Sequence, residues 1–335
     1  MKLSIITTIY KAEKDLPRLL DSMMQQKSPD LEFFLIDNGS PDRCGEIAAE
    51  YAKRDSRFTL YTIKDNIGYI RARNEGIRVC TGDYIGFCDS DDYLEPGGYD
   101  MAIEKIYETD CDLYITSYRT HSGEYVIENS LPYDVGLYED DDIKRNILPN
   151  AFGPYKNKRE LHGFMWKEIF RRRIVKDICF DETLKPYEDQ IFNLEAIARC
   201  NRVYIDDTPI YNYVVNPQSI TASIKNSFDF VTEYNRIYHL YVEKKRLATD
   251  NVHLCALSTD AMESIYSMFL CESKVKSRTI YQSMALIKQT IDSSWVNDIV
   301  DCAVALTIRM KVVKIALRLK LYSPLLRLMK LASRI

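Results

Sequence analysis

Three carboxylates stand within four residues at Asp89-Ser90-Asp91-Asp92. They directly follow an apolar run, Tyr84 to Cys88, that has the composition of a buried strand. Acids so close together repel one another unless a cation or abundant water offsets their charge. A hard divalent ion, Mn²⁺ or Mg²⁺, held by one or two carboxylates and a substrate diphosphate, would fit this arrangement. The same acids could instead cap a helix and face its dipole, and the pattern alone leaves both interpretations open.

The elements that would position these acids alternate between two hydrophobic periods over the first 118 residues. Short apolar runs predict strands, and stripes at helical spacing predict helices. The expected strands are residues 3–8, 31–37, 58–63, 84–88 and 112–118, and the expected helices are residues 15–26, 40–53, 69–79 and 96–108. This alternation predicts an α/β fold with a Rossmann-like, mostly parallel sheet.

Polar residues end the expected strands, and open parallel sheets bind their ligands at that edge. The first strand ends in Thr7-Thr8-Ile9-Tyr10, the second in Asp37-Asn38-Gly39-Ser40, and the fourth in the acids at 89–92. The sequence contains neither the glycine fingerprint of dinucleotide binding nor that of a P-loop. Phosphates would therefore have to be held by other means.

Four blocks of the sequence follow one another in a fixed order: Ser4 to Tyr10 with Glu13, Ile36 to Ser40 with Asp42, Asn66-Ile67-Gly68 followed by Ala72 to Gly76, and Gly82 to Asp92. Together these blocks resemble the successive blocks of glycosyltransferase family 2. The resemblance covers residues 1–118 strongly and continues more weakly through 163–170, 187–192 and 211–221. It implies the A-type glycosyltransferase fold and a nucleotide-diphospho-sugar donor, with UDP the expected nucleotide.

The resemblance also implies roles for individual residues. Asp91 and Asp89 would hold Mn²⁺ or Mg²⁺, Asp89 would also bind the donor by facing the ribose, and Thr8, Tyr10 and Asp37 would surround the nucleobase. A tyrosine ring can stack on a base and a carboxylate can accept from a uracil N–H, although Tyr10 could also simply pack at a strand end. The remaining residues expected to bind the donor are Glu13, Asn66, Gly68, Arg73, Ser90, Asp92 and Glu188. For Arg73, a phosphate contact and a solvated helix charge both remain open.

Glu188-Asp189 opens an expected helix over residues 188–200. Residues 166–170 before it fit a strand or a helix, and residues 203–205 and 210–214 after it are expected to form two strands. An acid pair at a helix start often only complements the helix dipole. The resemblance, however, implies that Asp189 is a general base that deprotonates an acceptor hydroxyl for in-line attack on the anomeric carbon. Such a single displacement would invert the anomeric centre.

Three departures from the family pattern motivate a second hypothesis. They are Asn38 where a second acid is common, Glu168 where a lysine is usual, and Val214-Val215 where a basic residue often stands. A catalytically silent subunit that binds a nucleotide sugar or serves as a membrane scaffold would explain them. A sugar nucleotidyltransferase is disfavoured, because the glycine-rich and basic N-terminal loop of such enzymes is missing.

The last 30 residues differ in charge from the rest of the chain. The whole chain has a formal charge of −4, which argues against a nucleic-acid partner. Residues 306–335 nevertheless hold eight basic residues and no acidic one, interleaved with Leu, Ile and Val. This pattern favours a helix in the interface of an anionic membrane, although a packed closing helix or an oligomer contact would also fit.

Cysteine spacing and hydropathy suggest the compartment. None of the nine cysteines forms a C-x-x-C pair, so we expect neither a zinc site nor a full disulfide framework and favour a reducing compartment. The apolar run at residues 3–10 is too short for a signal peptide. The sequence also has no apolar stretch long enough to predict a membrane span. We therefore expect a cytoplasmic protein, peripheral on the inner face of the cell membrane.

The expected organisation has three parts. Residues 1–118 would bind the nucleotide sugar, residues 119–225 would bind the acceptor, and residues 226–335 would form a helical C-terminal region with the basic tail. The expected acceptor is a lipid-linked or growing glycan of bacterial surface polysaccharide synthesis.

Overall fold

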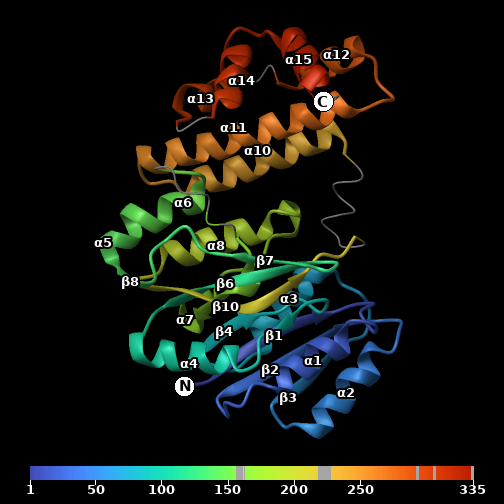
Figure 1. The fold of residues 1–335 in the computed structure, drawn as a ribbon, viewed down its shortest axis with the longest axis vertical. Coiled ribbons are helices and arrows are strands. Elements are labelled where there is room, and N and C mark those ends of the chain that lie inside the picture. Colours follow the sequence, from blue (N-terminus) through green and yellow to red (C-terminus); the bar gives the residue numbers. More distant parts are fainter. Residues whose placement is uncertain (156–160, 162, 218–227, 292–293, 305–306, 333–335) are drawn as a thin grey trace. The chain divides into compact units, whose positions relative to one another are not determined.

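A parallel sheet forms the first half of the fold in the computed structural model, which describes the whole chain apart from residues 156–160, 162, 218–227, 292–293, 305–306 and 333–335 (Figure 1). Its elements are β1 (Leu3–Ile9), α1 (Leu16–Met24), β2 (Leu31–Asn38), α2 (Cys44–Arg54), β3 (Phe58–Ile63), α3 (Tyr69–Val79) and β4 (Tyr84–Phe87). The strands lie in the order β3-β2-β1-β4 and pair in parallel. Every residue of β2 is buried, as expected for a strand covered on both faces.

The second half of the sheet adds strands of both directions. They are β5 (Tyr93–Leu94), β6 (Leu113–Ser122), β7 (Tyr125–Asn129), β8 (Gly136–Glu139), β9 (Glu168–Arg171) and β10 (Arg202–Val214), with α4 (Gly98–Thr109) between β5 and β6. β9 pairs antiparallel to both β4 and β6, so β6 runs in the direction of β4, and β10 is parallel to β6. Six of the ten strands in the described part of the chain therefore share one direction, which confirms the mostly parallel α/β fold.

Helices cover both faces of the sheet because neighbouring strand residues point to opposite sides. Ile5 packs in one core cluster with α1, α2 and α4. The next residue, Ile6, faces α3 instead, where a Cβ on Gly76 would lie only 2.3 Å from its Cγ2. On this second face Phe87 of β4 contacts Phe192 of α8 (Glu188–Ala198), edge to face at 6.2 Å between ring centroids.

Two segments differ from the sequence-based expectation. Residues 203–205 and 210–214 were expected as two strands, but they form the single strand β10, with register shifts on either side of Pro209. Proline cannot donate to a neighbouring strand, so a bulge there is the usual solution. Residues 166–170, which could have been strand or helix, form the end of a short 3-10 turn (Met165–Lys167) and most of β9.

Short elements connect β8 to β10. They are α5 (Asp140–Asp142), a π-helical turn (Ile143–Ile147), α6 (Leu148–Phe152), α7 (Arg172–Val175), a 3-10 turn (Glu182–Leu184) and α8. The chain separates into two units by its internal contacts. Unit 1 comprises residues 1–145, 163–183 and 188–217, and unit 2 comprises residues 146–162, 184–187 and 218–335. The finer division after residues 118 and 225 remains a prediction.

Unit 2 contains the expected helical C-terminal region. Its main helices are α10 (Phe230–Leu247), α11 (Asn251–Lys274), α12 (Ile280–Ile291), α13 (Ser294–Cys302), α14 (Ile308–Arg318) and α15 (Tyr322–Ala332). The fully buried Lys244 of α10 pairs with Asp260 of α11 at 2.8 Å. None of the helices in the described ranges combines the length and hydropathy needed to cross a membrane.

Candidate active site

The carboxyl ends of β1, β2 and β4 bring most of the expected donor-binding residues to one edge of the sheet. Ile9 pairs with Asp37 in the parallel register of β1 and β2, and the backbone N–H of Cys88 donates to the carbonyl of Ile6 at 3.0 Å. Tyr10, Asp37 and the acid loop (residues 89–92) therefore lie at adjacent strand ends. This edge is where an open α/β sheet binds its ligand.

The acid loop is fastened to β10 by Tyr211. The backbone N–H of Asp89 donates to the Tyr211 hydroxyl oxygen at 3.0 Å, and that hydroxyl donates to Asp92 Oδ2 at 2.7 Å. The N–H of Val214 donates to Asp92 Oδ1, also at 2.7 Å. Asp92 is fully buried, and burial together with the charge of Asp89 raises its pKa well above the usual range. Asp92 therefore anchors the loop, while its expected contact with a donor remains a prediction.

Asp89 and Asp91 keep part of their surface exposed, and Ser90 between them is also half-buried. Asn216 donates to Asp91 Oδ2 at 3.3 Å, and the Arg18 guanidinium donates to the Asp91 carbonyl. Burial and the charge of Asp89 raise the pKa of Asp91. The loop thus concentrates negative charge that a cation would relieve.

Two carboxylates fit a Mg²⁺ or Mn²⁺ ion that a substrate diphosphate also binds, since such ions commonly take only one or two protein ligands. Within the described ranges, no three or more His, Cys, Asp or Glu side chains gather as a metal site by themselves. A shared metal site at Asp89 and Asp91 stays a prediction.

Arg73 of α3 connects the acid loop to the expected base. Its Nη1 donates to Asp189 Oδ1 at 2.7 Å, and its Nη2 lies 3.4 Å from Asp89 Oδ1. The side chain is only 9% exposed, and its guanidinium lies 5.1 Å from the centroid of the Phe180 ring. Burial disfavours the charged form of Arg73, but the charges of Asp189 and Asp89 outweigh this effect and raise the pKa of Arg73 above its usual value. Arg73 is thus a buried bridge and not a solvated surface charge.

Glu188 and Asp189 lie in the first turn of α8. Tyr69 of α3 donates to Glu188 Oε1 at 2.6 Å, whereas Glu188 Oε2 is buried and has no hydrogen-bond partner within the described part of the chain. Burial raises the pKa of Asp189 to about 7; the salt bridge to Arg73 opposes this rise, and the charges of Glu188 and Asp89 add to it. A carboxylate that titrates near neutral pH is well suited to act as a general base.

At the end of β2, two asparagines hold neighbouring loops together. Asn38 donates to Asn66 Oδ1 at 3.2 Å and accepts from the N–H of Ile67 at 3.0 Å. A carboxylate at position 38 could not donate in this way, which explains the departure at Asn38. Gly39 has a φ of +67°, and a Cβ there would lie 2.8 Å from the Asn66 nitrogen, so the close approach of the two loops requires glycine.

Asp37 is buried beside this junction, and its Oδ1 accepts from the N–H of Ser40 at 3.0 Å. The Tyr10 ring is 39% exposed at the end of β1, as stacking on a base would require. Thr8 is half-buried, and Gly68, with a φ of +87°, precedes the first turn of α3. Their roles in nucleobase and donor binding remain predictions.

Glu13 connects two loops, in addition to its expected role in binding the donor. Its carboxylate accepts from the backbone N–H of Arg43 at 3.0 Å, and its own N–H donates to Asp42 at 3.2 Å. These two contacts join the loop after β1 to the start of α2. No contact links Glu13 to the acid loop among the hydrogen bonds of the described residues.

Glu168 lies at the start of β9 and is 1% exposed. Neither carboxylate oxygen makes a hydrogen bond of ordinary geometry within the described residues. Burial raises the pKa of Glu168 to about 8; the charge of Asp189 adds to the rise, and the charge of Lys167 and the amide of Asn193 oppose it. The sequence marked Glu168 only as a departure, because its burial depends on the position of β9 between two other strands.

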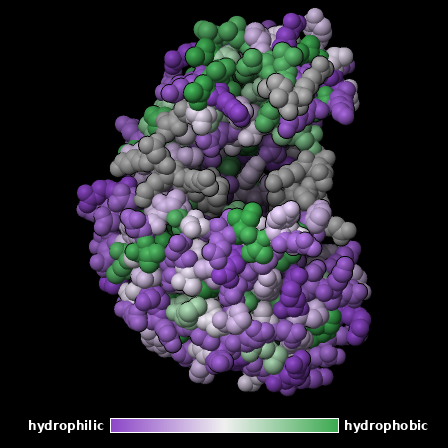
Figure 2. Space-filling view, viewed as in Figure 1, coloured by the Kyte–Doolittle hydropathy of each residue, from purple (hydrophilic) through white to green (hydrophobic). Residues whose placement is uncertain are grey.

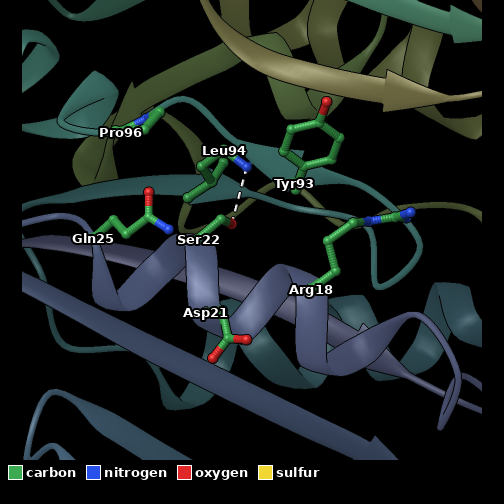
Figure 3. A pocket seen from close by; sticks show the side chains of 7 residues that line it. All are labelled: Arg18, Asp21, Ser22, Gln25, Tyr93, Leu94 and Pro96. Carbon is green, nitrogen blue, oxygen red and sulfur yellow. Dashed lines mark hydrogen bonds between the residues drawn. The ribbon is translucent and has the colours of Figure 1, made fainter.

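A cavity of about 540 Å³ lies between α1 and the β5 segment (Figure 3). Arg18 projects from α1 beside Tyr93, with its guanidinium 5.4 Å from the ring centroid, and Ser22 accepts from the N–H of Leu94 at 3.0 Å. None of the residues expected to bind donor or metal lines this cavity. The cavity is linked to the site through Arg18, which lines the cavity and also donates to the acid loop.

Comparison with known proteins gives a family match and a match to solved folds. The family model described as Glycosyl transferase family 2 matches residues 4–176. The uncharacterized glycosyltransferase EpsJ of Bacillus subtilis (strain 168) is 32% identical over 225 residues, which is 65% of this chain and 62% of EpsJ. The putative glycosyltransferase EpsH of the same strain is 27% identical, with coverage of 65% and 62%. The matched region thus spans less than two thirds of either relative.

The crystal structure of Staphylococcus aureus TarS 1–349 in complex with UDP-GlcNAc superimposes with a TM-score of 0.73. The alignment covers 100% of this chain and 92% of that chain, at 21% sequence identity. TarS is a poly(ribitol-phosphate) beta-N-acetylglucosaminyltransferase. At this identity the likeness concerns the fold, which is the A-type fold that the sequence predicted.

Proposed function

Because the chain belongs to glycosyltransferase family 2, we propose that it transfers a sugar from UDP to a hydroxyl of a lipid-linked or growing glycan in bacterial surface polysaccharide synthesis. The observation that carries the proposal is the bridge made by Arg73, which contacts Asp89 on the donor side and Asp189 on the base side. UDP as the nucleotide is supported by the UDP-GlcNAc complex of TarS, which shares the fold.

Asp189 would act as the base of a single, inverting displacement. Arg73 holds Asp189 Oδ1, so the other oxygen is left to take the proton from the acceptor hydroxyl. The acceptor oxygen then bonds to the anomeric carbon from the face opposite the diphosphate. The bond from that carbon to the diphosphate oxygen breaks, and its electron pair leaves with UDP. The buried salt bridge fixes the orientation of the base before the acceptor arrives.

Asp89 and Asp91 would hold Mn²⁺ or Mg²⁺ together with the donor diphosphate. When bound, such an ion neutralises charge on the leaving diphosphate. The hydrogen bond from Tyr211 to Asp92 and that from the Asp89 N–H to Tyr211 hold the acid loop in one conformation. The chain itself therefore preorganises both carboxylates.

The C-terminal helices support a position at the inner face of the cell membrane. One side of α14 is buried within unit 2 through Met310, Val313, Ala316 and Leu317. Its other side exposes Ile308 (81%), Val312 (42%), Ile315 (57%) and Leu319 (60%), at helical spacing and among cationic residues. Hydrophobic and hydrophilic side chains lie intermixed over these helices (Figure 2). Packing of α14 as the last part of the helical region would explain its buried side. An anionic membrane would cover its exposed apolar side.

Release of UDP tests the proposal. We would incubate the protein with a panel of UDP-sugars and glycan acceptors, with and without Mn²⁺, and compare Asp189→Asn and Asp91→Asn with the wild type. Each variant should lose about 100-fold or more in rate. The matched control is Asp177→Asn, an exposed aspartate that should keep full activity. Unchanged turnover in both site variants would refute the assignment, and UDP binding without any turnover would favour the catalytically silent subunit.

A further inference from the structure

The cavity beside α1 has a polar wall and an apolar wall (Figure 3). The polar wall is one face of α1, because its lining residues follow the helical spacing i, i+3, i+4 and i+7. They are Arg18, Asp21, Ser22 and Gln25. The apolar wall is made by Tyr93, Leu94 and Pro96, which come directly after the acid loop in the sequence. The volume of about 540 Å³ lies within the range of small-molecule sites in proteins.

Hydrogen bonds hold the apolar wall against α1. The N–H of Leu94 donates to Ser22 Oγ at 3.0 Å, and the Ser22 hydroxyl donates to the carbonyl of Leu19 at 2.7 Å. One turn further along, Gln26 Nε2 donates to the carbonyl of Glu95 at 2.9 Å. Ser22 and Gln26 are both buried, so water does not compete for these contacts. The two walls are therefore fixed before a ligand enters, which lowers the entropic cost of binding.

Arg18 stands at one end of the cavity and keeps two donor groups for a ligand. Both of its contacts with oxygen atoms of the described residues use Nη2, which donates to the Asp91 carbonyl and lies 3.7 Å from Asp15 Oδ1. The guanidinium carbon lies 5.4 Å from the centroid of the Tyr93 ring, which restricts the side chain. The Nε and Nη1 groups of Arg18 can therefore donate to a ligand.

Gln25 stands at the other end of the cavity, with Ser22 between it and Arg18 (Figure 3). Gln25 is exposed, and its amide offers a carbonyl acceptor and two N–H donors. Asp21 is turned toward α2, because its Oδ1 accepts from the Tyr51 hydroxyl at 2.6 Å. The polar groups available to a ligand are thus a guanidinium at one end and an amide at the other.

These groups disfavour two classes of ligand. A phosphate needs a surplus of positive charge, whereas Asp15 and the nearby Asp21 already offset the charge of Arg18. A purely apolar ligand would cover the guanidinium and the amide without pairing their donors. A neutral ring with hydroxyls on its edge and C–H groups on its faces fits both walls, since a hydroxyl both donates and accepts. A pyranose is such a ring.

We propose that the cavity beside α1 is a second sugar subsite, which binds a neutral pyranose ring of the glycan. Ring hydroxyls accept from Arg18 and exchange hydrogen bonds with the Gln25 amide, while C–H groups of the ring cover the apolar wall. The inference rests on the proposed function, which supplies a glycan as the ligand. It adds a subsite that contains none of the residues expected to bind the donor or the metal or to act as the base.

Occupancy of this subsite should act on the acid loop through Arg18. A sugar that accepts from Nε and Nη1 orders the same guanidinium whose Nη2 donates to the Asp91 carbonyl. An ordered Arg18 stabilises that contact, and with it the conformation of the acid loop. Coupling between two ligands is reciprocal, so the sugar and the donor should each tighten the binding of the other, by about 5-fold.

Ligand-observed NMR tests the subsite, because it detects the weak binding expected of single sugars. We would record saturation-transfer difference spectra of the full chain with methyl glycosides of glucose, galactose and N-acetylglucosamine and with short oligosaccharides of each. At least one probe should give a saturable signal. Gln25→Ala should weaken that probe about 3- to 10-fold through the loss of the amide hydrogen bonds. Gln25→Trp, which fills the cavity, should abolish the signal.

The control places the same substitution elsewhere. Gln289→Trp changes an exposed glutamine of α12 and should leave the signal unchanged. UDP binding without sugar, measured by calorimetry, should be equal in the wild type and both Gln25 variants, which also shows that the variants fold. In the wild type a saturating probe should tighten UDP binding about 5-fold, and in Gln25→Trp it should have no effect.

The subsite is overturned if no probe binds to a protein that binds UDP. It is also overturned if Gln25→Trp binds the probes as well as the wild type does, because the sugar then lies elsewhere. Equal affinity for UDP with and without the probe would refute the coupling through Arg18. A wild type that binds glycosides through Gln25 but neither binds UDP nor releases it from a UDP-sugar would contradict the proposed function and leave the subsite supported.

Discussion

Replacing Arg73 by methionine should move the titration of Asp189 to higher pH. Arg73 Nη1 lies 2.7 Å from Asp189 Oδ1. Two unit charges about 4 Å apart at an effective dielectric constant of about 20 interact by about 4 kcal/mol, which corresponds to about 3 pKa units. The Asp189 side chain is 27% exposed, and solvent screens part of this interaction. We therefore expect a shift of about 2 units.

The shift has a definite effect on rate. With a pKa of about 7, about half of Asp189 is deprotonated at neutral pH. A rise of about 2 units would leave about one molecule in 100 with an active base. The turnover number at pH 7 should fall about 50-fold and recover as the pH approaches about 9. The assay is the initial rate of UDP release at saturating donor and acceptor, from about pH 5 to about pH 10.

A second variant should shift the pKa of Asp189 in the opposite direction. Glu188 raises the pKa of Asp189, so Glu188→Gln should move the acidic limb of the profile to lower pH, and the glutamine oxygen can still accept from Tyr69. Arg71→Met is the control, because Arg71 is 61% exposed on the same helix and pairs with Glu182 instead. An unmoved limb in Arg73→Met, or shifts of the same sign in both site variants, would refute the electrostatic reasoning.

Three other predictions concern stability and location. Lys244→Met should lower the free energy of unfolding by about 3 kcal/mol in urea titration, because it leaves the carboxylate of Asp260 without its buried partner; the double variant with Asp260→Asn should recover part of that loss, and a larger loss would contradict the pairing. Because the folded-state pKa of Glu168 is raised to about 8, folding retains a proton that the unfolded chain releases, so stability should fall as the pH rises from about 4.5 to about 8. Glu168→Gln should flatten this dependence and add about 4 kcal/mol at pH 8, and an unchanged slope would exclude a buried acid there. Replacing Ile315 and Leu319 by glutamate should reduce sedimentation with phosphatidylglycerol vesicles about 10-fold and leave the weak sedimentation with neutral vesicles unchanged; equal binding by both proteins would remove the support for membrane docking.

The order of strands and helices in the first half could be predicted well because each element repeats a local pattern. The helix expected at 69–79 has those bounds in the structure, since its apolar stripe, the preceding Gly68 and the following short strand are all local signals. The family resemblance also indicated which acids to consider, although it could not show that Asp92 points into the fold.

The parts of the site that the sequence could not predict depend on contacts between residues far apart in the chain. Arg73 and Asp189 are 116 residues apart, and the sequence offered no reason to prefer this bridge over a solvated arginine. Trp166 stacks on both Phe164 and Tyr211, and Tyr211 comes from a separate segment, so ring spacing along the chain could not reveal these contacts. A partial signal existed in Tyr211-Asn212-Tyr213, whose alternation places both tyrosines on one face of a strand.

The position of β9 has a consequence for how the chain is made. Residues 168–171 lie between β4 and β6, although both of those strands are synthesised earlier. A nascent chain that has emerged from the ribosome only as far as residue 160 therefore exposes the edges of β4 and β6 that β9 covers in the finished sheet. Such edges are prone to mispairing with other chains. We expect the translating intermediate to need protection, by chaperones for example, until the missing strand arrives and closes the gap.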